Sequence, residues 1–282
     1  MTVQIQEFYD ELTATFTYIV FNETSYKGVV IDPVLDYEQD TENISYESIE
    51  KVLDFINSKG LKISYILDTH IHADHITGAS VLKESLPGSI TAIGAGALEV
   101  REHFSSKFPT YNESPYDKYL NDEDILELEG LSIKVLATPG HTPSCVSYLI
   151  GDSLFTGDLL FLPDSGTGRC DFPNGSSLAM YNSIKDKVYS LPKEIKIYVG
   201  HDYAAGGREV KFKSSVEEQM LNNIQITHRT ALDEFVTKRD KRDKDLNEPK
   251  LLNQSLQVNI NGGDVSPLLN GNRINLKKEN TL

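Results

Sequence analysis

One short stretch decides the fold of this chain: Thr69-His70-Ile71-His72-Ala73-Asp74-His75-Ile76-Thr77-Gly78. It follows Ile63–Leu67, an apolar, β-branched run that predicts a buried strand. His70 and His72 are two residues apart, so on an extended segment their side chains project to the same side. Asp74 and His75 follow where we expect the chain to turn into a helix beginning near Ile76. This clustering of potential ligands predicts a site for one metal ion or for two adjacent ions.

Three weaker motifs each follow a later predicted strand. They are Thr138-Pro139-Gly140-His141-Thr142, Phe155-Thr156-Gly157-Asp158 and Gly200-His201-Asp202-Tyr203. Each motif alone is typical of an ordinary turn. Loops that follow strands meet at one edge of a sheet, however, and five of the seven histidines lie in these motifs and the first one. The four motifs together therefore predict one polar site.

Strands and helices alternate through both halves of the sequence. The predicted strands are Ala14–Asn22, Gly28–Ile31, Ile63–Leu67, Leu131–Ala137, Cys145–Ile150, Ser153–Thr156 and Ile195–Val199, with a hairpin turn at Gly151-Asp152. The predicted helices are Tyr46–Lys59, capped by Ser45 and ended by Gly60, then Leu178–Ser190 and Ser214–Leu246. The charge run Lys238–Asp245 is typical of a solvated helix face or connector. The tail from Glu248, with Asn261-Gly262-Gly263 and Asn270-Gly271-Asn272, is rich in turn residues. This alternation predicts two similar α/β layers.

Composition narrows the class of protein. The chain has 282 residues, 39% of them hydrophobic, and a formal net charge of −15, which opposes broad binding to nucleic acids or anionic membranes. No apolar run approaches the roughly 20 residues of a membrane span, and the first residues lack the pattern of a secretory signal. Two cysteines are too few for a disulfide framework. We expect a cytoplasmic protein in which Cys145 packs in the core and Cys170 is a small residue near the pocket.

The order of these motifs resembles the metallo-β-lactamase superfamily, an αββα sandwich whose metal motifs run HxHxDH, His, Asp, His. Within it the details are most similar to the persulfide dioxygenases, through Ala73 in the first motif and the stretch Gly168-Arg169-Cys170-Asp171-Phe172. Residues 249–259 are similar to bacterial dioxygenases related to β-lactamase hydrolase-like proteins. The resemblance implies a single α/β domain over residues 1–282, with two mixed sheets flanked by helices, the metal motifs at 69–203 and an extension at 214–282.

The resemblance also assigns roles to individual residues. It implies one Fe(II) per chain, held by His70, His141 and Asp158, the two-histidine, one-carboxylate triad that leaves positions open. Four residues match zinc positions in dinuclear relatives and would either orient the ligands or hold a second metal: His72, Asp74, His75 and His201. The glutathione carboxylates would be bound first by Arg169, with Tyr203 and Arg208 as further candidates.

The resemblance implies an iron-dependent oxidation of glutathione persulfide, or of a related small persulfide, by O₂ to sulfite and thiol. Residues 161–168 form a longer stretch than in the human-type enzymes, which would reshape the glutathione pocket. The alternative is a hydrolase of the hydroxyacylglutathione hydrolase (glyoxalase II) or lactonase type, with one or two Zn(II) per chain. A third hypothesis, a non-catalytic interaction module, predicts missing ligands, whereas all seven positions are filled. A homodimer is suggested by the resemblance alone.

Overall fold

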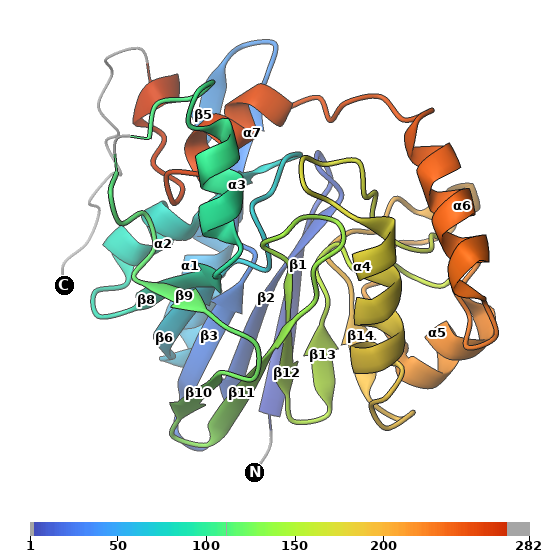
Figure 1. The fold of residues 1–282 in the computed structure, drawn as a ribbon. Coiled ribbons are helices and arrows are strands. Elements are labelled where there is room, and N and C mark those ends of the chain that lie inside the picture. The colour runs from blue at the N-terminus through green and yellow to red at the C-terminus, as the bar shows by residue number, and fades with distance from the viewer. Residues whose placement is uncertain (1–2, 111, 270–282) are drawn as a thin grey trace.

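The computed structural model describes residues 3–110 and 112–269, and within them two six-stranded sheets pack face to face with helices outside (Figure 1). The first sheet has the order β1 (Val3–Asp10), β2 (Thr15–Asn22), β3 (Lys27–Ile31), β6 (Lys62–Leu67), β8 (Ile90–Gly94) and β9 (Lys118–Leu120). The second has the order β10 (Ile125–Leu128), β11 (Leu131–Ala137), β12 (Val146–Ile150), β13 (Ser153–Phe155), β14 (Lys196–Tyr198) and β15 (Lys213–Ser215). A small sheet joins β5 (Asn43–Ser45), β4 (Val34–Glu38) and β7 (Ile76–Thr77). The predicted αββα class is confirmed.

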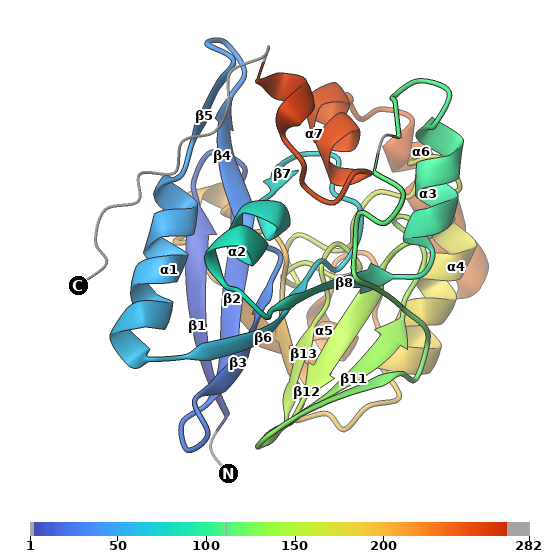
Figure 2. The same cartoon turned by 90° about the vertical axis from the view of Figure 1, so that its left-hand side faces the viewer.

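The helices cover both outer faces and one edge (Figure 2). The first sheet is covered by α1 (Glu47–Lys59) and α2 (Ala79–Ser85), and the second by α4 (Ser177–Asn182), its π-helical continuation Ser183–Val188, α5 (Val216–Asn222) and α6 (Leu232–Asp243). At the edge that the motif loops occupy lie α3 (Ala97–Phe104) and α7 (Leu252–Asn259). Two short 3₁₀ turns complete the set, Ala205–Gly207 and Ser266–Leu268.

Strand β2 shows how the sequence builds the sandwich. Its side chains alternate between two apolar environments, as the two-residue period of a strand requires. Phe16 and Tyr18 belong to the core between the sheets, whereas Ile19 and Phe21 pack with the buried face of α1. All eight residues of β2 are buried. The hydrophobic alternation that normally marks a half-exposed strand is therefore absent.

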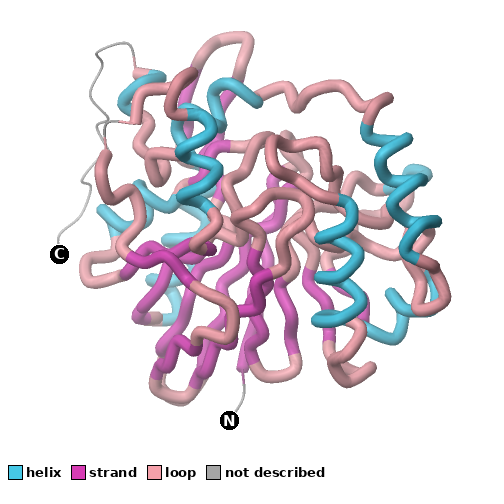
Figure 3. Tube along the Cα trace, in the orientation of Figure 1, coloured by secondary structure: helices cyan, strands magenta, loops and turns pink. Residues whose placement is uncertain are grey.

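The strands that precede the four motifs end at one edge of the sandwich. β3 and β6 are parallel, as are β13 and β14, while β11 and β13 both run antiparallel to β12. The carboxyl ends of β6, β11, β13 and β14 consequently open into the crowded loops at the top of Figure 3. A backbone bridge from Thr15 to His201 ties the two sheets together there. The fold thus places the four motifs side by side.

Two predicted helix starts are wrong. The chain does not enter a helix near Ile76, because Ile76 and Thr77 pair with β4 before α2 begins at Ala79. Ser45 is not the N-cap of α1, since it pairs with Asp36 in the small sheet and Tyr46 occupies the cap position. The predicted end is confirmed, with Gly60 in the left-handed conformation at φ 63°.

The C-terminal region departs most from the prediction. The expected helix over 214–246 is two helices, because the side chain of Asn223 turns the chain by accepting the backbone N–H groups of Gln225 and Ile226. The charge run is not wholly solvated, since Arg239 and Asp243 are buried. The tail contains helix α7, and its Asn270-Gly271-Asn272 lies outside the described residues. Among the described helices, none has the length and apolar character needed to span a membrane.

Candidate metal centre

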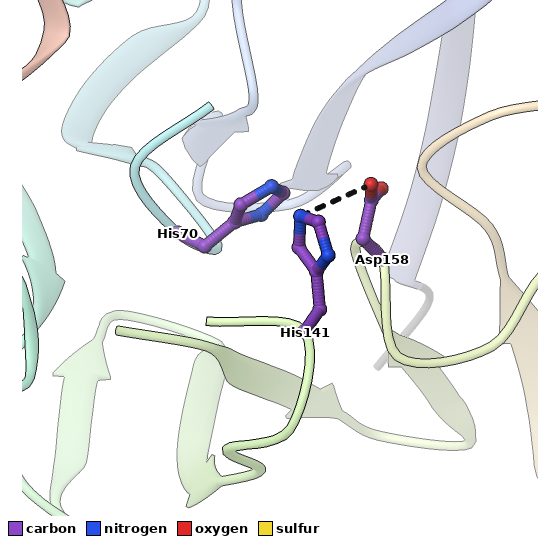
Figure 4. Close-up of side chains that lie close together, drawn as sticks. All are labelled: His70, His141 and Asp158. Carbon is purple, nitrogen blue, oxygen red and sulfur yellow. Dashed lines mark ion pairs between the residues drawn. The ribbon is translucent and has the colours of Figure 1, made fainter. Parts of the chain in front are cut away.

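The structure brings His70, His141 and Asp158 together from three different loops. One potential ligand atom from each side chain lies within 4.8 Å of the others. Figure 4 shows the three side chains pointing toward one another, with His141 Nε2 at 3.6 Å from Asp158 Oδ2. All three residues are buried, His70 to 1% exposure. The geometry is that of a small enclosed site with two nitrogen donors and one oxygen donor.

Each of these histidines has its second ring nitrogen held by the protein. The Thr69 hydroxyl donates to Asp32, so its oxygen is left to accept from His70 Nδ1 at 3.0 Å. His141 Nδ1 donates to the carbonyl oxygen of Arg169 at 2.7 Å. The Nε2 lone pairs are thereby directed to the centre, and His70 Nε2 is buried without a hydrogen-bond partner. Such support of the remote nitrogen is typical of metal-binding histidines.

A second group of donors lies beside the first. One ligand atom each from His72, Asp74 and His75 again lies within 4.8 Å of the others. His201 Nε2 lies 3.2 Å from Asp74 Oδ2 and 3.3 Å from Asp158 Oδ1, so it adjoins both groups. His72 Nδ1 and His75 Nε2 are buried without a partner. The structure therefore holds all seven predicted ligands in two adjoining groups.

The electrostatics of the site fit a bound cation. Burial, reinforced by neighbouring imidazoles, holds the pKa of His70 and of His72 well below its usual value, so both rings are neutral lone-pair donors. Burial also raises the pKa of Asp158, which means that its charge is poorly solvated. A divalent cation would supply the missing counter-charge and would satisfy the unpartnered nitrogens. The donor set of two imidazoles and one carboxylate suits Fe(II), and the adjoining set would accept a second ion.

Two supporting residues escaped the sequence analysis. Asp32 accepts hydrogen bonds from the Thr69 backbone N–H at 2.7 Å and from His72 Nε2 at 3.1 Å, which fixes the ring of His72. Asn259 of α7 donates to the carbonyl oxygens of His72 and His75. Asp32 could have been found from the sequence, because it directly follows a predicted buried strand, as the metal motifs do. Asn259 ends the segment 249–259 that carries part of the resemblance, but nothing in that segment marked its side chain as a contact of the first motif.

Arg169 and Tyr203 line a cavity of about 990 Å³ that also contains His141 and Asp158. The Arg169 guanidinium donates through two nitrogens to Asp171, each at 2.6 Å, and through a third to the carbonyl oxygen of Asn247. Their roles in substrate binding stay predictions.

Arg208 is not part of the lining of this cavity, and it pairs with Asp164 and Asp202. Its role in substrate binding also stays a prediction. Both cysteines are free and buried, and burial raises the pKa of the Cys145 thiol to about 12 and that of Cys170 as well.

Gly157 offers a direct test of how the loops fit together. Its backbone has φ 49°, and a Cβ there would lie 2.4 Å from Thr69 Oγ1, the atom that supports His70. We expect Gly157→Ala to lower the free energy of unfolding by about 2–5 kcal/mol, from left-handed backbone strain plus overpacking, and to lower the metal content. Gly60→Ala is the matched control, because Gly60 has φ 63° with open space around it. Urea denaturation gives the free energy of unfolding of both variants. If Gly157→Ala and Gly60→Ala lower it equally, this account is contradicted.

Comparisons with known proteins agree with this geometry. A sequence model of the Metallo-beta-lactamase superfamily matches residues 12–201. The protein named Glyoxylase B2 from Dictyostelium discoideum is 41% identical over 94% of this chain and 92% of its own length. The mitochondrial persulfide dioxygenase ETHE1 of Bos taurus is 30% identical over 94% of this chain and 91% of its own.

Two further similarities concern a longer protein and a solved structure. The Beta-lactamase hydrolase-like protein of Xylella fastidiosa (strain Temecula1) is 38% identical over 96% of this chain, which spans only 64% of that relative's length. The crystal structure of ETHE1 from Myxococcus xanthus has a TM-score of 0.75 and 28% identity, covering 93% of this chain and all of that one. The similarities reach beyond residue 201 and so include the helical C-terminal region.

Proposed function

Because the chain belongs to the metallo-beta-lactamase superfamily, we propose that it is an iron-dependent dioxygenase that oxidises a small thiol persulfide, such as glutathione persulfide, to sulfite and thiol. The observation that carries the proposal is the buried triad of His70, His141 and Asp158, of which His141 and Asp158 line the cavity. A relative named persulfide dioxygenase ETHE1 and a solved structure named ETHE1 support it over most of the chain. In this proposal the triad holds one Fe(II).

The protein's own residues would prepare the site for that chemistry. Bound iron would supply the one-electron chemistry that lets O₂ react with an electron-rich sulfur, which a d¹⁰ zinc ion does not offer. The chain holds the ligand rings rigid through Thr69 and the Arg169 carbonyl. Phe161 and Tyr203 line the cavity, and their rings pack against the buried ring of His201. A low-dielectric pocket strengthens each charged contact to the substrate.

A second candidate function rests on the second donor group. His72, Asp74, His75 and His201 could hold another ion, and two adjacent zinc ions would suit a hydrolase that activates water against an ester or thioester. Relatives named Glyoxylase B2 and Probable metallo-hydrolase are compatible with this alternative.

One experiment separates the two candidates. The protein is purified without oxygen and its metals are counted, after which O₂ uptake is followed on glutathione persulfide and hydrolysis on hydroxyacylglutathione thioesters and lactones. The proposal expects about one iron per chain and uptake of one O₂ per sulfite formed. About two zinc ions per chain with hydrolysis and no O₂ uptake would replace the dioxygenase with the hydrolase.

A further inference from the structure

The cavity above the metal centre has two cations that the protein leaves unpaired. Four arginine or lysine side chains belong to its lining: Arg169, Arg239, Arg242 and Lys250. Arg169 is engaged by Asp171 and the carbonyl of Asn247, and Arg239 by Asp243 and Gln225. Within residues 3–110 and 112–269, neither Arg242 nor Lys250 has a side-chain hydrogen bond or ion pair. Their charges are available to a ligand.

The paired arginines fix the segments that carry the unpaired cations. Arg239 joins helix α6 to Thr167 and Gln225, which lie under it. Arg169 holds the carbonyl oxygen of Asn247, in the connection from α6 to α7 that crosses the upper edge in Figure 1. Gln39 of the loop between β4 and β5 donates to the carbonyl oxygen of Lys250 at 3.1 Å. Arg242 and Lys250 therefore project from anchored backbone, which lowers the entropic cost of binding.

The lining also carries negative charge, on the two neighbours of Gln39. Glu38 and Asp40, on either side of Gln39, also line the cavity, and both are exposed. Apolar lining comes from Tyr37, Leu12, Phe161, Tyr203, Leu246 and Leu251. A volume of about 990 Å³ is at the upper end of the range of about 300–1,000 Å³ for small-molecule sites. A lining with both free cations and carboxylates suits a zwitterionic ligand that has carboxylates as well as an ammonium group, and disfavours a ligand that carries negative charge throughout.

We propose that Arg242 and Lys250 bind the carboxylates of a zwitterionic peptide thiol, with Glu38 and Asp40 facing its ammonium group, while its sulfur lies toward His141 and Asp158. This inference rests on the proposed function for the position of the sulfur. It assigns the recognition of the thiol carrier to helix α6 and the segment that follows it. Both lie beyond residues 12–201, the part that the superfamily model matches.

The test measures binding of glutathione, the unoxidised carrier, to the metal-loaded protein by titration calorimetry without oxygen. Arg242→Ala and Lys250→Ala are each expected to raise the Kd by about two- to fivefold, with a larger rise in the double variant, as for solvent-accessible charge pairs. Lys241→Ala is the matched control, because Lys241 is the exposed neighbour on α6 that does not line the cavity. Binding of 2-mercaptoethanol, which has no charged group, should be the same in all variants.

Two outcomes would overturn the inference. One is a double variant that binds glutathione as tightly as the unaltered protein, and the other is an unaltered protein that binds no glutathione. The proposed function fails separately, when the unaltered protein binds glutathione but takes up no O₂ with its persulfide. Asp40→Asn tests the acidic part of the lining, since it should weaken binding of glutathione but leave that of N-acetylglutathione unchanged. Equal effects on both ligands would refute the role of the acidic side.

Discussion

His141→Ala is expected to lose the tightly bound metal and to reduce persulfide-dependent O₂ uptake by at least about a thousandfold. Loss of a residue that merely supports a ligand typically costs about 10–100-fold in metal affinity or activity, so loss of a ligand should cost more. His141 supplies one of the two nitrogens in the triad, and Nδ1 of its ring is already committed to the Arg169 carbonyl. Among the described residues, no other side chain of that loop belongs to a group that could hold a metal ion. Metal analysis and O₂ uptake measured on the same sample check this result.

The controls for this prediction separate ligand loss from general damage. His103→Ala should keep full metal content and activity, because His103 is exposed on α3 and is not part of the cavity lining. His75→Ala distinguishes one metal from two, since His75 belongs to the second donor group. In a mononuclear enzyme, His75→Ala should lower the activity by about 10–100-fold, because it disturbs only a side chain near the ligands. In a dinuclear enzyme, His75→Ala should lower the activity as much as His141→Ala does. Full metal occupancy in His141→Ala would refute the proposed triad.

The residues of the candidate site were easier to pick out of the sequence than the bounds of the elements around them, for a physical reason. Metal ions are bound by only a few residue types, and in this chain His70, His141 and Asp158 each lie soon after a strand. They therefore stand out in the sequence. The structure brings the three side chains together. The supporting contacts are less specific. An aspartate after a strand usually serves a turn, and only the pairing of β3 with β6 places Asp32 beside His72.

The C-terminal region shows what a one-dimensional pattern leaves out. Lys238–Asp245 is charged at every position, and such a run is usually solvated. Packing of α6 against α4 nevertheless buries Arg239 and Asp243, while Arg242 stays exposed at the cavity. The sequence of charges does not distinguish an arginine that is paired inside the protein from one whose side chain is left unpaired at the cavity. That distinction depends on long-range partners such as Gln225 and Thr167, which no local pattern reveals.

Arg239→Met is expected to be strongly destabilising, with a loss of about 3–5 kcal/mol in the free energy of unfolding. Arg239 and Asp243 are 3% and 4% exposed, and Asp243 also accepts the backbone N–H of Cys170 at 2.8 Å. Removing the guanidinium strands a buried carboxylate, which costs more than the ion pair itself contributes.

Replacing both Arg239 and Asp243 should lower the free energy of unfolding much less than replacing Arg239 alone. Arg239→Met with Asp243→Asn removes the stranded charge and keeps an acceptor for the Cys170 N–H, so part of the lost stability should return. Lys238→Met is the control, since its pair with Glu234 is at the surface and contributes at most about 1 kcal/mol. Urea denaturation of the four proteins gives the comparison. If Arg239→Met is no less stable than Lys238→Met, the buried pair does not anchor α6, and the fixed position of Arg242 over the cavity loses its support.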